Sequence, residues 1–439
     1  MDRSTAILER FRALYPREID LSLYRMKVLM DKLGRPQLRL PPVVHVAGTN
    51  GKGSTTAFLH AMLEADGKSV HVYTSPHLVR FHERMRIGAP GGGHFVDEDE
   101  LIEVLIAVER ANAGAPIPQF EITTAAAFQL FADHPADYLL LEVGLGGRYD
   151  ATNIIADPLV SVITQIALDH EKYLGDTGEK IASEKAGIIK RDRPVVVAPQ
   201  GDPVLDVIER EAARLGAPVH LANRDWIVHA EHGRLVYQDL DGLLDLPAPR
   251  LVGRHQYTNA GLAVAALRAA VPATPTAAIE AGLTNVDWPA RMQRLTTGRL
   301  VARTRADAEI WLDGGHNPAA GLVIAEAVAD LEERVSRPLF MICGMLNTKE
   351  PVGFFRPFAG LARQVYTVPV PSSAAGRDPV ELAEAAKSAG VAAVPVADVE
   401  TALDLISAQT GLPLPPRILI CGSLYLAGSV LEANGTPPG

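Results

Sequence analysis

The chain has few cysteines and no long apolar stretch. Its only two cysteines, Cys343 and Cys421, lie in apolar runs. Two cysteines cannot build a disulfide framework or a four-ligand zinc site. No uncharged run approaches the roughly 20 residues that cross a bilayer, and the charged start of the chain lacks the apolar core of a signal peptide. We therefore expect a protein of the reducing cytoplasm without a transmembrane helix.

Basic residues and aromatics are also scarce. Lys and Arg number 42 against 52 Asp and Glu, which gives a net charge of −10, and aromatics make up 5%. The acidic balance excludes a bulk attraction for nucleic acid or for an anionic membrane. Any anionic ligand must be held by local basic groups.

What the chain does have is enough apolar sequence, 47% of 439 residues, for two or three domains of roughly 150 residues each. Apolar β-branched runs alternate with Ala- and Leu-rich segments of helical period, which is typical of βαβ units around a parallel sheet. The pattern predicts strands over Val43 to Ala47, Ser69 to Tyr73, Tyr138 to Val143, Leu159 to Thr164 and Pro194 to Ala198. It predicts helices over Ser54 to Ala65, Ile122 to Ala132 and Tyr257 to Ala270.

A second αβ series begins near Arg291, and this change predicts a domain boundary. We expect a first domain over 1–290, a hinge over 291–298 and a C-terminal domain over 299–439 whose first strands span Leu300 to Arg303 and Glu309 to Leu312. Before the boundary, the string HGRLVYQDLDG predicts a hairpin. After it, the strand-to-glycine junctions WLDGGHN, MICGMLN and LICGSLY predict a crevice at the carboxyl ends of a parallel sheet. The fold class is thus α/β, with a P-loop-type, mostly parallel sheet domain and a smaller Rossmann-like C-terminal domain.

The strongest motif is VVHVAGTNGKGST, from Val43 to Thr55. An apolar strand leads into a glycine-rich turn, and the turn opens into a helix, so backbone N–H groups and the helix N-terminus favour a phosphate. Lys52 would neutralise the phosphates, and a hydroxyl of Ser54 or Thr55 would reach Mg²⁺. Because Gly53 follows Lys52, the motif departs from the usual P-loop and disfavours GTPases and ordinary P-loop ATPases.

Other polar residues follow predicted strands. Glu142 ends a buried strand, and such a carboxylate is a natural Mg²⁺ ligand, although an ion-paired or capping glutamate is an alternative. Asp169 and His170 lie in a polar loop, and Lys185 lies on a helix that starts near Thr177. A surface histidine and a salt-bridged lysine are the alternatives there.

The even spacing of Arg80, Arg84 and Arg86 predicts one side of an extended segment, with a solvated basic patch as the alternative. Phe120 either offers an aromatic face to a flat ring or packs in the core.

Taken together, these strings resemble the Mur ligase superfamily and specifically its folate branch, the dihydrofolate synthase/folylpolyglutamate synthase family. The resemblance rests on A-G-T-N-G-K-G-S-T, E-V-G-L-G-G-R-Y-D-A-T-N, L-D-H, E-K-A-G and D-G-G-H-N-P, which occur in order along the chain. Gly314 and Gly315 vary within the last of these motifs.

The resemblance implies the following site residues. ATP would be bound by Thr49, Asn50, Gly51, Lys52, Gly53, Ser54, Asn259, Arg291 and Asp313. Two Mg²⁺ ions would be held by Ser54, Ser75, Glu142, His170 and a carbamoylated Lys185, and a monovalent cation is a further candidate. The pteroate portion would contact Asp20, Leu21, Phe120, Thr123, Asp150 and Ala151, and L-glutamate would contact His316 and Ser423. The catalytic residues would be Lys52, Lys185 and His316.

The implied activity is an ATP-dependent ligase that adds L-glutamate to dihydropteroate, and also to reduced folates, through an acyl phosphate. A folylpolyglutamate synthase alone, or a Mur-type ligase of another carboxylate, remains open, although the 42 residues before Val43 are too few for a UDP-sugar-binding domain. A nucleotide-dependent regulatory switch would not need glutamate, and a redox protein would need a G-x-G-x-x-G that the second domain lacks. We expect a monomer whose partners are small molecules, with no nucleic acid and no membrane.

Overall fold

The computed structural model describes residues 3–15, 22–371, 373 and 375–439. By internal contacts the chain divides into two compact units. The larger comprises Met1–Arg250 and Tyr257–Val286, and the smaller comprises Leu251–Gln256 and Asp287–Gly439. The division falls between Val286 and Asp287, near the sequence-based boundary at Arg291, and places Arg291 in the smaller unit.

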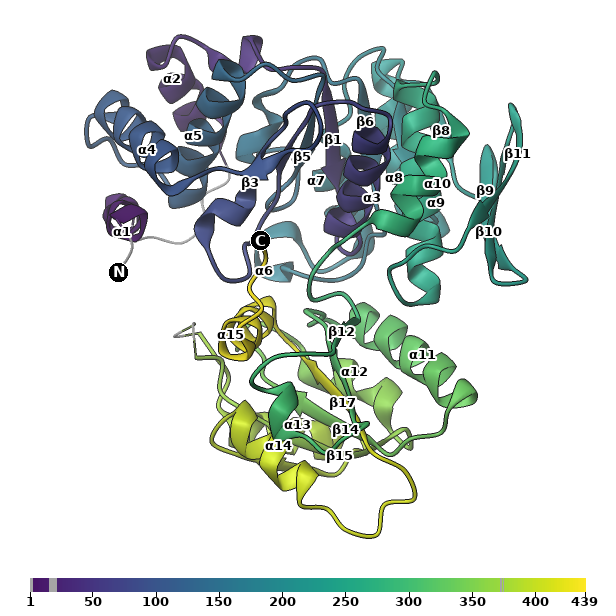
Figure 1. Ribbon diagram of the computed structural model, residues 1–439. Helices are drawn as coiled ribbons and strands as arrows, with labels where there is room; N and C mark the ends of the chain where they lie inside the picture. The colour runs from purple at the N-terminus through teal and green to yellow at the C-terminus, as the bar shows by residue number, and fades with distance from the viewer. Residues whose placement is uncertain (1–2, 16–21, 372, 374) are drawn as a thin grey trace. The chain divides into compact units, whose positions relative to one another are not determined.

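An eight-stranded sheet forms the centre of the larger unit, in the order β4-β3-β2-β5-β1-β6-β7-β8 (Figure 1). Strands β2, β5, β1, β6, β7 and β8 run parallel to one another, whereas β3 is antiparallel to both β2 and β4. Strands β1, β2, β6 and β7 are buried along their whole length, which explains their largely apolar sequences. The bounds are β1 Val43–Ala47, β2 Val70–Tyr73, β3 Met85–Ile87, β4 His94–Phe95, β5 Tyr138–Glu142, β6 Val160–Ile163, β7 Val195–Val197 and β8 Val219–Leu221.

Helices surround this sheet, with α3 packed against β5 and α10, and α7 against α8. Side chains cap two of them, because Asp97 accepts a hydrogen bond from Glu100 N at the start of α4 and Thr177 accepts one from Lys180 N at the start of α7. The bounds are α1 Arg3–Leu14, α2 Tyr24–Lys32, α3 Lys52–Ala65, α4 Glu98–Asn112, α5 Gln119–Asp133, α6 Glu171–Leu174, α7 Gly178–Ala186, α8 Asp202–Leu215, α9 Arg254–Ala270 and α10 Thr276–Asn285.

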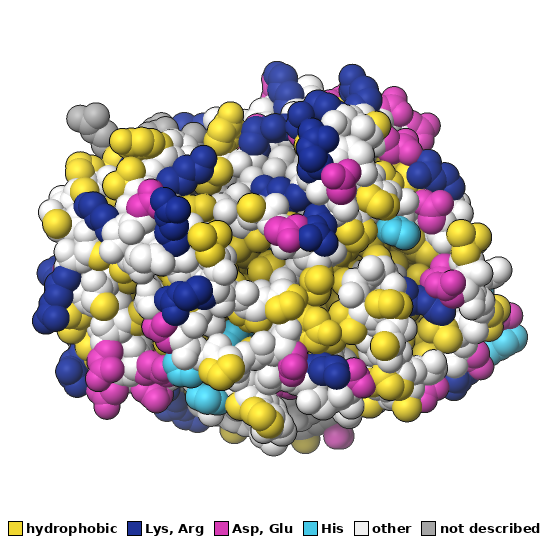
Figure 2. Space-filling view, turned by 90° about the horizontal axis from the view of Figure 1, so that it is seen from above, with side chains coloured by type: hydrophobic (Ala, Val, Ile, Leu, Met, Phe, Trp, Pro, Cys, Tyr) yellow, Lys and Arg dark blue, Asp and Glu magenta, His cyan; other side chains and the backbone are white. Residues whose placement is uncertain are grey.

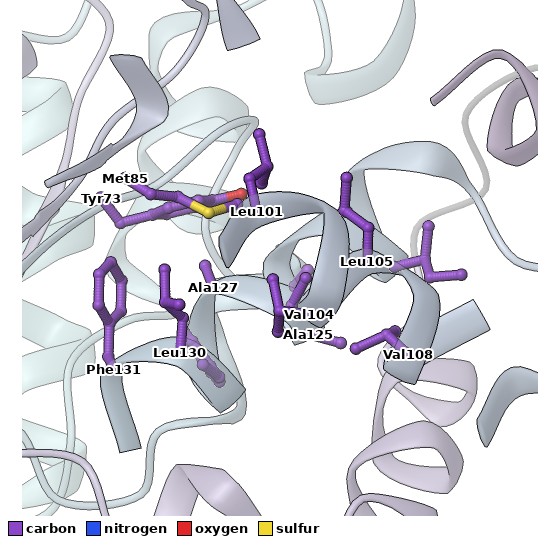
Figure 3. Packing of buried hydrophobic residues seen from close by; sticks show 14 of the residues in the cluster. Tyr73, Met85, Leu101, Val104, Leu105, Val108, Ala125, Ala127, Leu130 and Phe131 are labelled. Atoms are coloured by element: carbon purple, nitrogen blue, oxygen red, sulfur yellow. The ribbon is translucent and has the colours of Figure 1, made fainter. Parts of the chain in front are cut away.

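One core cluster of the larger unit joins α4 and α5 to the sheet. Figure 3 shows Leu101 and Leu105 of α4 near residues of α5, with Phe131 of α5 close to Tyr73 and Met85 of the strands. All five side chains are fully buried. This packing holds α5, which carries Phe120 and Thr123, against the sheet.

The hairpin predicted from HGRLVYQDLDG is confirmed. Strands β9 (Trp226–Glu231), β10 (Arg234–Asp239) and β11 (Gly242–Pro247) form a separate antiparallel sheet in the order β11-β10-β9. Its inner face is apolar, with Leu235 and Tyr237 buried.

The smaller unit contains a six-stranded sheet in the order β12-β13-β17-β14-β15-β16, parallel except for β12. The three strand-to-glycine junctions follow β13, β17 and β14, which are neighbours in this order, so the junctions lie at one edge of the sheet. The bounds are β12 Gln293–Leu295, β13 Glu309–Leu312, β14 Leu339–Cys343, β15 Ala362–Thr367, β16 Ala393–Pro395, β17 Arg417–Cys421, α11 Pro318–Arg334, α12 Pro351–Phe355, α13 Pro379–Ser388, α14 Val399–Ser407 and α15 Leu424–Asn434.

The strand predicted over Leu300 to Arg303 is wrong. Residues Val301–Arg303 form a short 3-10 helix instead. The amide oxygen of Asn434 accepts hydrogen bonds from the backbone N–H groups of Leu300 and Val301 at 3.0 and 3.4 Å, so these donors do not enter a strand ladder. The strand that flanks β13 on this side is β12.

Among the described residues, no helix combines the length and the apolar character that a membrane crossing requires. Although the whole chain is acidic, Figure 2 shows a face on which Lys and Arg side chains gather. The net charge therefore does not describe the local distribution of charge.

Candidate functional site

The glycine-rich segment after β1 forms a tight turn that leads into α3 at Lys52. Gly48 and Gly51 have φ angles of 153° and 88°. A methyl group on Gly48 would collide with Thr164, and one on Gly51 would lie 2.5 Å from Asn259 Oδ1. Glycine is therefore required at both positions, and the turn has no side chains there to keep a phosphate from the backbone N–H groups. The same contact brings Asn259 to the turn, as predicted for an ATP-binding set.

The segment after β6 holds this turn in place. Thr49 N and Asn50 N donate to Gln165 O at 2.9 and 3.2 Å. Thr49 Oγ1 donates to Ala167 O at 3.0 Å, and Thr164 Oγ1 donates to Asn50 O at 2.7 Å. Sequence reasoning did not assign Thr164 or Gln165 to the site. The signal available was their position directly after β6, which is the parallel neighbour of β1.

Lys52 and Lys185 converge on one carbonyl of the turn. Lys52 Nζ donates to Gly48 O at 3.1 Å and to Thr49 O at 3.3 Å, and Lys185 Nζ donates to Gly48 O at 2.7 Å. Lys52 Nζ also lies 4.0 Å from Glu142 Oε1. Two ammonium groups beside one oxygen repel each other, and an anion between them would relieve this repulsion.

Lys185 is only 4% exposed. Burial and, to a lesser extent, the charge of Lys52 lower its pKa to about 7, although Asp169 and Asp150 act in the opposite direction. A lysine with this pKa carries a large fraction of free amine near neutral pH. The side chain is therefore a nucleophile as well as a cation.

Glu142 lies at the carboxyl end of β5, and Ser75 follows the neighbouring strand β2. Glu142 is 5% exposed, and Ser75 N donates to its Oε2 at 3.3 Å. His170 begins α6 with a φ of 54°, and its Nε2 lies 3.9 Å from Asp169 Oδ1.

In the described ranges, no group of three or more His, Cys, Asp or Glu side chains is placed to hold a metal ion. The predicted metal set instead combines Glu142 and His170 with two serine hydroxyls and Lys185. Its chemistry fits Mg²⁺ because Glu142 supplies a buried carboxylate beside the phosphate turn and Ser54 is buried in the first turn of α3.

Four of the residues predicted to contact the pteroate portion lie on α5 and after β5. Phe120 and Thr123 are on α5, and a methyl group on Gly144 would collide with the Phe120 ring. Asp150 is buried at the start of a short 3-10 helix that begins with Ala151. The structure thus brings four of the six predicted residues to neighbouring elements. Asp20 and Leu21 lie outside the described residues.

The extended segment predicted for the three arginines is wrong. Residues Phe81–Arg84 form a 3-10 helix, because Glu83 Oε1 accepts hydrogen bonds from Arg80 N and from the preceding backbone. Arg84 Nε donates to His77 Nδ1 at 2.9 Å, whereas Arg86 donates to Gly93 O at 2.6 Å. The side chains therefore have different partners and do not form one basic row.

In the smaller unit, the predicted residues gather at the carboxyl edge of the sheet. Asp313 directly follows β13, and it accepts hydrogen bonds from Met292 N at 2.8 Å and Gly315 N at 2.7 Å. Burial raises the pKa of Asp313, although the nearby charge of Arg291 lowers it. His316 Nδ1 lies 3.0 Å from Gly314 O.

Ser423 follows β17 and caps α15, where its Oγ accepts a hydrogen bond from Tyr425 N at 3.1 Å. Because β13 and β17 are parallel neighbours, Asp313 and Ser423 end at the same sheet edge. The predicted nucleotide and glutamate residues of this unit are thus close in the fold.

The chain is similar to proteins of known family along most of its length. Residues 46–267 match the Mur ligase middle domain. The folylpolyglutamate synthase of Lacticaseibacillus casei is 34% identical over 426 residues, which cover 93% of each chain. The solved structure of E. coli FolC in complex with DHPP and ADP superposes with a TM-score of 0.86 at 31% identity, covering 98% of this chain and 97% of that one.

A bifunctional folylpolyglutamate synthase/dihydrofolate synthase with Mn, AMPPNP and L-glutamate bound superposes with a TM-score of 0.83 at 32% identity, covering 98% of this chain and 97% of that one. The similarity extends over both units and includes the whole of the phosphate turn. The chain therefore belongs to the dihydrofolate synthase/folylpolyglutamate synthase family of Mur-type ligases.

Proposed function

We propose that this protein is an ATP-dependent ligase that joins L-glutamate to dihydropteroate, and to reduced folates, through an acyl phosphate. The observation that carries the proposal is the convergence of Lys52, Lys185 and Glu142 at a glycine turn whose backbone suits a phosphate. Family membership over nearly the whole chain supports the choice of substrates.

The first step transfers the terminal phosphoryl group of ATP. An acceptor carboxylate oxygen attacks the γ-phosphorus, the bond from that phosphorus to the β–γ bridging oxygen breaks, and ADP leaves. The N–H groups at the start of α3 and the Lys52 side chain bind the phosphates and stabilise the charge that develops on them. In the second step the glutamate amine attacks the acyl carbon, phosphate leaves, and the amine loses a proton.

Glu142, Ser54, Ser75, His170 and Lys185 are the residues that would hold Mg²⁺. When bound, Mg²⁺ supplies charge neutralisation at the phosphates. The relative with Mn and AMPPNP bound supports a divalent metal in this family. A monovalent cation, a monomeric state and a cytoplasmic location remain predictions from the sequence.

Carbamoylation of Lys185 is part of the proposal. The free amine attacks CO₂, a new N–C bond forms, and the proton that leaves gives a carbamate anion. Such an anion would remove the repulsion between Lys185 and Lys52 and would provide a carboxylate-like ligand beside the turn. Burial of Lys185, which lowers its pKa to about 7, supports this assignment because the free amine is the form that reacts.

In the smaller unit, we assign Arg291 and Asp313 to ATP, and His316 and Ser423 to L-glutamate. Asp313 accepts a hydrogen bond from Met292 N and so holds the backbone beside Arg291. His316 is the candidate that orients the glutamate amine or accepts its proton.

ADP release by the purified protein tests the function. We expect release that requires L-glutamate together with dihydropteroate or tetrahydrofolate, and that falls at least about a hundredfold in Lys52→Met because the phosphates lose their cation. Activity with tetrahydrofolate alone would select the folylpolyglutamate synthase alternative. ATP turnover that ignores glutamate would favour a nucleotide switch, and no turnover with either acceptor would overturn the proposal.

A further inference from the structure

A fully buried histidine lies in the centre of the larger sheet and takes no part in the proposed chemistry. His45 is 0% exposed on β1, between Val44 and Val46, and its strand neighbours are Leu141 and Ser161. Burial lowers its pKa to about 3, so the ring is neutral. An apolar side chain would suit this strand better, because Nδ1 of His45 has no hydrogen-bond partner in the part of the chain that the structure describes.

The other ring nitrogen starts a chain of hydrogen bonds with a defined direction. His45 Nε2 lies 2.9 Å from Thr152 Oγ1, and Thr152 Oγ1 donates to Asp150 Oδ1 at 2.5 Å. Since the hydroxyl proton is directed to the carboxylate, the hydroxyl oxygen must accept from His45. His45 is therefore the Nε2–H tautomer.

Asp150 connects this chain of hydrogen bonds to the turn after β5. Its Oδ2 accepts from Leu145 N at 2.9 Å, and its Oδ1 also accepts from Thr152 N at 3.0 Å. The turn packs closely against α7, because a methyl group on Gly147 would lie 2.8 Å from Glu184 O of that helix. A shift of Asp150 would therefore move the turn against the helix that carries Lys185.

We propose that His45 is a positioning residue for the acceptor substrate, since it orients the Thr152 hydroxyl and thereby fixes the Asp150 carboxylate and the turn over residues 144–147. Phe120 packs on Gly144 of the same turn, so Asp150 and Phe120, two of the residues predicted to contact the pteroate portion, both depend on this turn. The kinetic part of this inference rests on the proposed function.

The test compares His45→Leu with a matched control, His71→Leu. His71 is also 0% exposed and lies on β2 of the same sheet, and its ring nitrogens lie 3.1 Å from His134 O and 2.9 Å from Gly88 N, both backbone atoms. We expect His45→Leu to raise KM for dihydropteroate about tenfold, as loss of a supporting hydrogen bond does elsewhere. KM for ATP should change less than about twofold, because Thr164 and Gln165 hold the phosphate turn.

The control should lose at least as much stability as His45→Leu while its KM for dihydropteroate stays within about twofold of wild type. Equal KM changes in the two variants would reduce His45 to a structural role and overturn the inference. His45→Gln, which keeps an N–H donor at the position of Nε2, should restore most of the lost affinity. Thr152→Val should raise KM similarly, and the double variant His45→Leu/Thr152→Val should be no worse than either single one.

A spectroscopic measurement separates this inference from the proposed function. The imidazole ¹⁵N shifts of His45, assigned by comparison with His45→Gln, should show the Nε2–H tautomer in wild type and should change in Thr152→Val. An Nδ1–H tautomer would overturn the inference even in an active enzyme. If the tautomer is as expected but wild type shows no glutamate-dependent turnover, the proposed function fails and the hydrogen-bond chain stands.

Discussion

Lys185 combines two properties that a surface lysine lacks, namely burial and a second ammonium group nearby. Its contact with Gly48 O spans 137 positions of the sequence, so the sheet creates it and α7 only presents the side chain. Burial destabilises the charged form, and the neighbouring Lys52 adds to this effect. The residue is thus prepared for reaction with CO₂ by its surroundings.

The first prediction at the residue scale concerns this lysine. We expect Lys185→Ala to lose at least about a hundredfold in ligase rate, because a ligand-bearing group beside the phosphates is removed. Wild-type protein in ¹³C-bicarbonate should show a carbamate ¹³C resonance that Lys185→Ala lacks.

Lys190 provides the control, since burial also lowers its pKa, to about 8, and its Nζ donates to Asn153 Oδ1 at 2.8 Å. Lys190→Ala should keep the carbamate resonance. Full activity in Lys185→Ala, or a resonance that persists in it, would contradict the assignment.

At the scale of an element, the start of α7 decides how Lys185 is presented. Thr177 accepts from Lys180 N and so satisfies one of the free donors in the first turn of the helix. We expect Thr177→Ala to lower the free energy of unfolding by about 1 kcal/mol and the ligase rate about threefold, since small displacements of site residues slow reaction. Urea denaturation and ADP release measure the two effects.

Asp97→Ala is the matched control for this cap. Asp97 accepts from Glu100 N at the start of α4, a helix that carries none of the predicted site residues. It should lose about the same stability with an unchanged rate. A rate loss in Asp97→Ala equal to that in Thr177→Ala would attribute the effect to stability alone.

At the scale of the whole molecule, buried neutral histidines link stability to pH. Burial lowers the pKa of His45 to about 3 and that of His255 to about 4. Because these values lie below the unfolded pKa of roughly 6.5, the unfolded state binds more protons in acid. Their contribution is fully present above about pH 6.5 and is lost as the pH falls toward the folded pKa.

We therefore expect the free energy of unfolding to decrease between about pH 6.5 and 4.5, by up to about 1.4 kcal/mol per pH unit for each such histidine. Equilibrium urea titrations followed by tryptophan fluorescence measure this slope. His45→Leu should reduce the slope, whereas substitution of the exposed His232 by Ala should leave it unchanged. An identical slope in wild type and His45→Leu would contradict the prediction.

Local signals predicted much of the fold. The apolar run Val43 to Ala47 became β1, and the helix expected from Ser54 begins slightly earlier, at Lys52. Both depend on residues close in sequence, as does the cap at Thr177. The extended segment predicted for the arginines was wrong, although the contact that decides its structure is also local. Glu83 accepts hydrogen bonds from nearby backbone N–H groups and so bends the chain, and the even spacing of the arginines does not reveal this contact.

By itself the sequence determined the α/β class, the phosphate turn and the order of the family motifs. The spacing of apolar residues and the need for glycine in a tight turn both depend on only a few neighbouring residues. Only the tertiary structure decided that Lys52 and Lys185 share Gly48 O, that Thr164 closes on the turn, and that His45 reaches Thr152 across 107 positions. These contacts follow from the strand order β5-β1-β6, in which parallel neighbours distant in sequence end at a common edge. No local pattern records which strands become neighbours, because that choice is made by packing of the whole sheet.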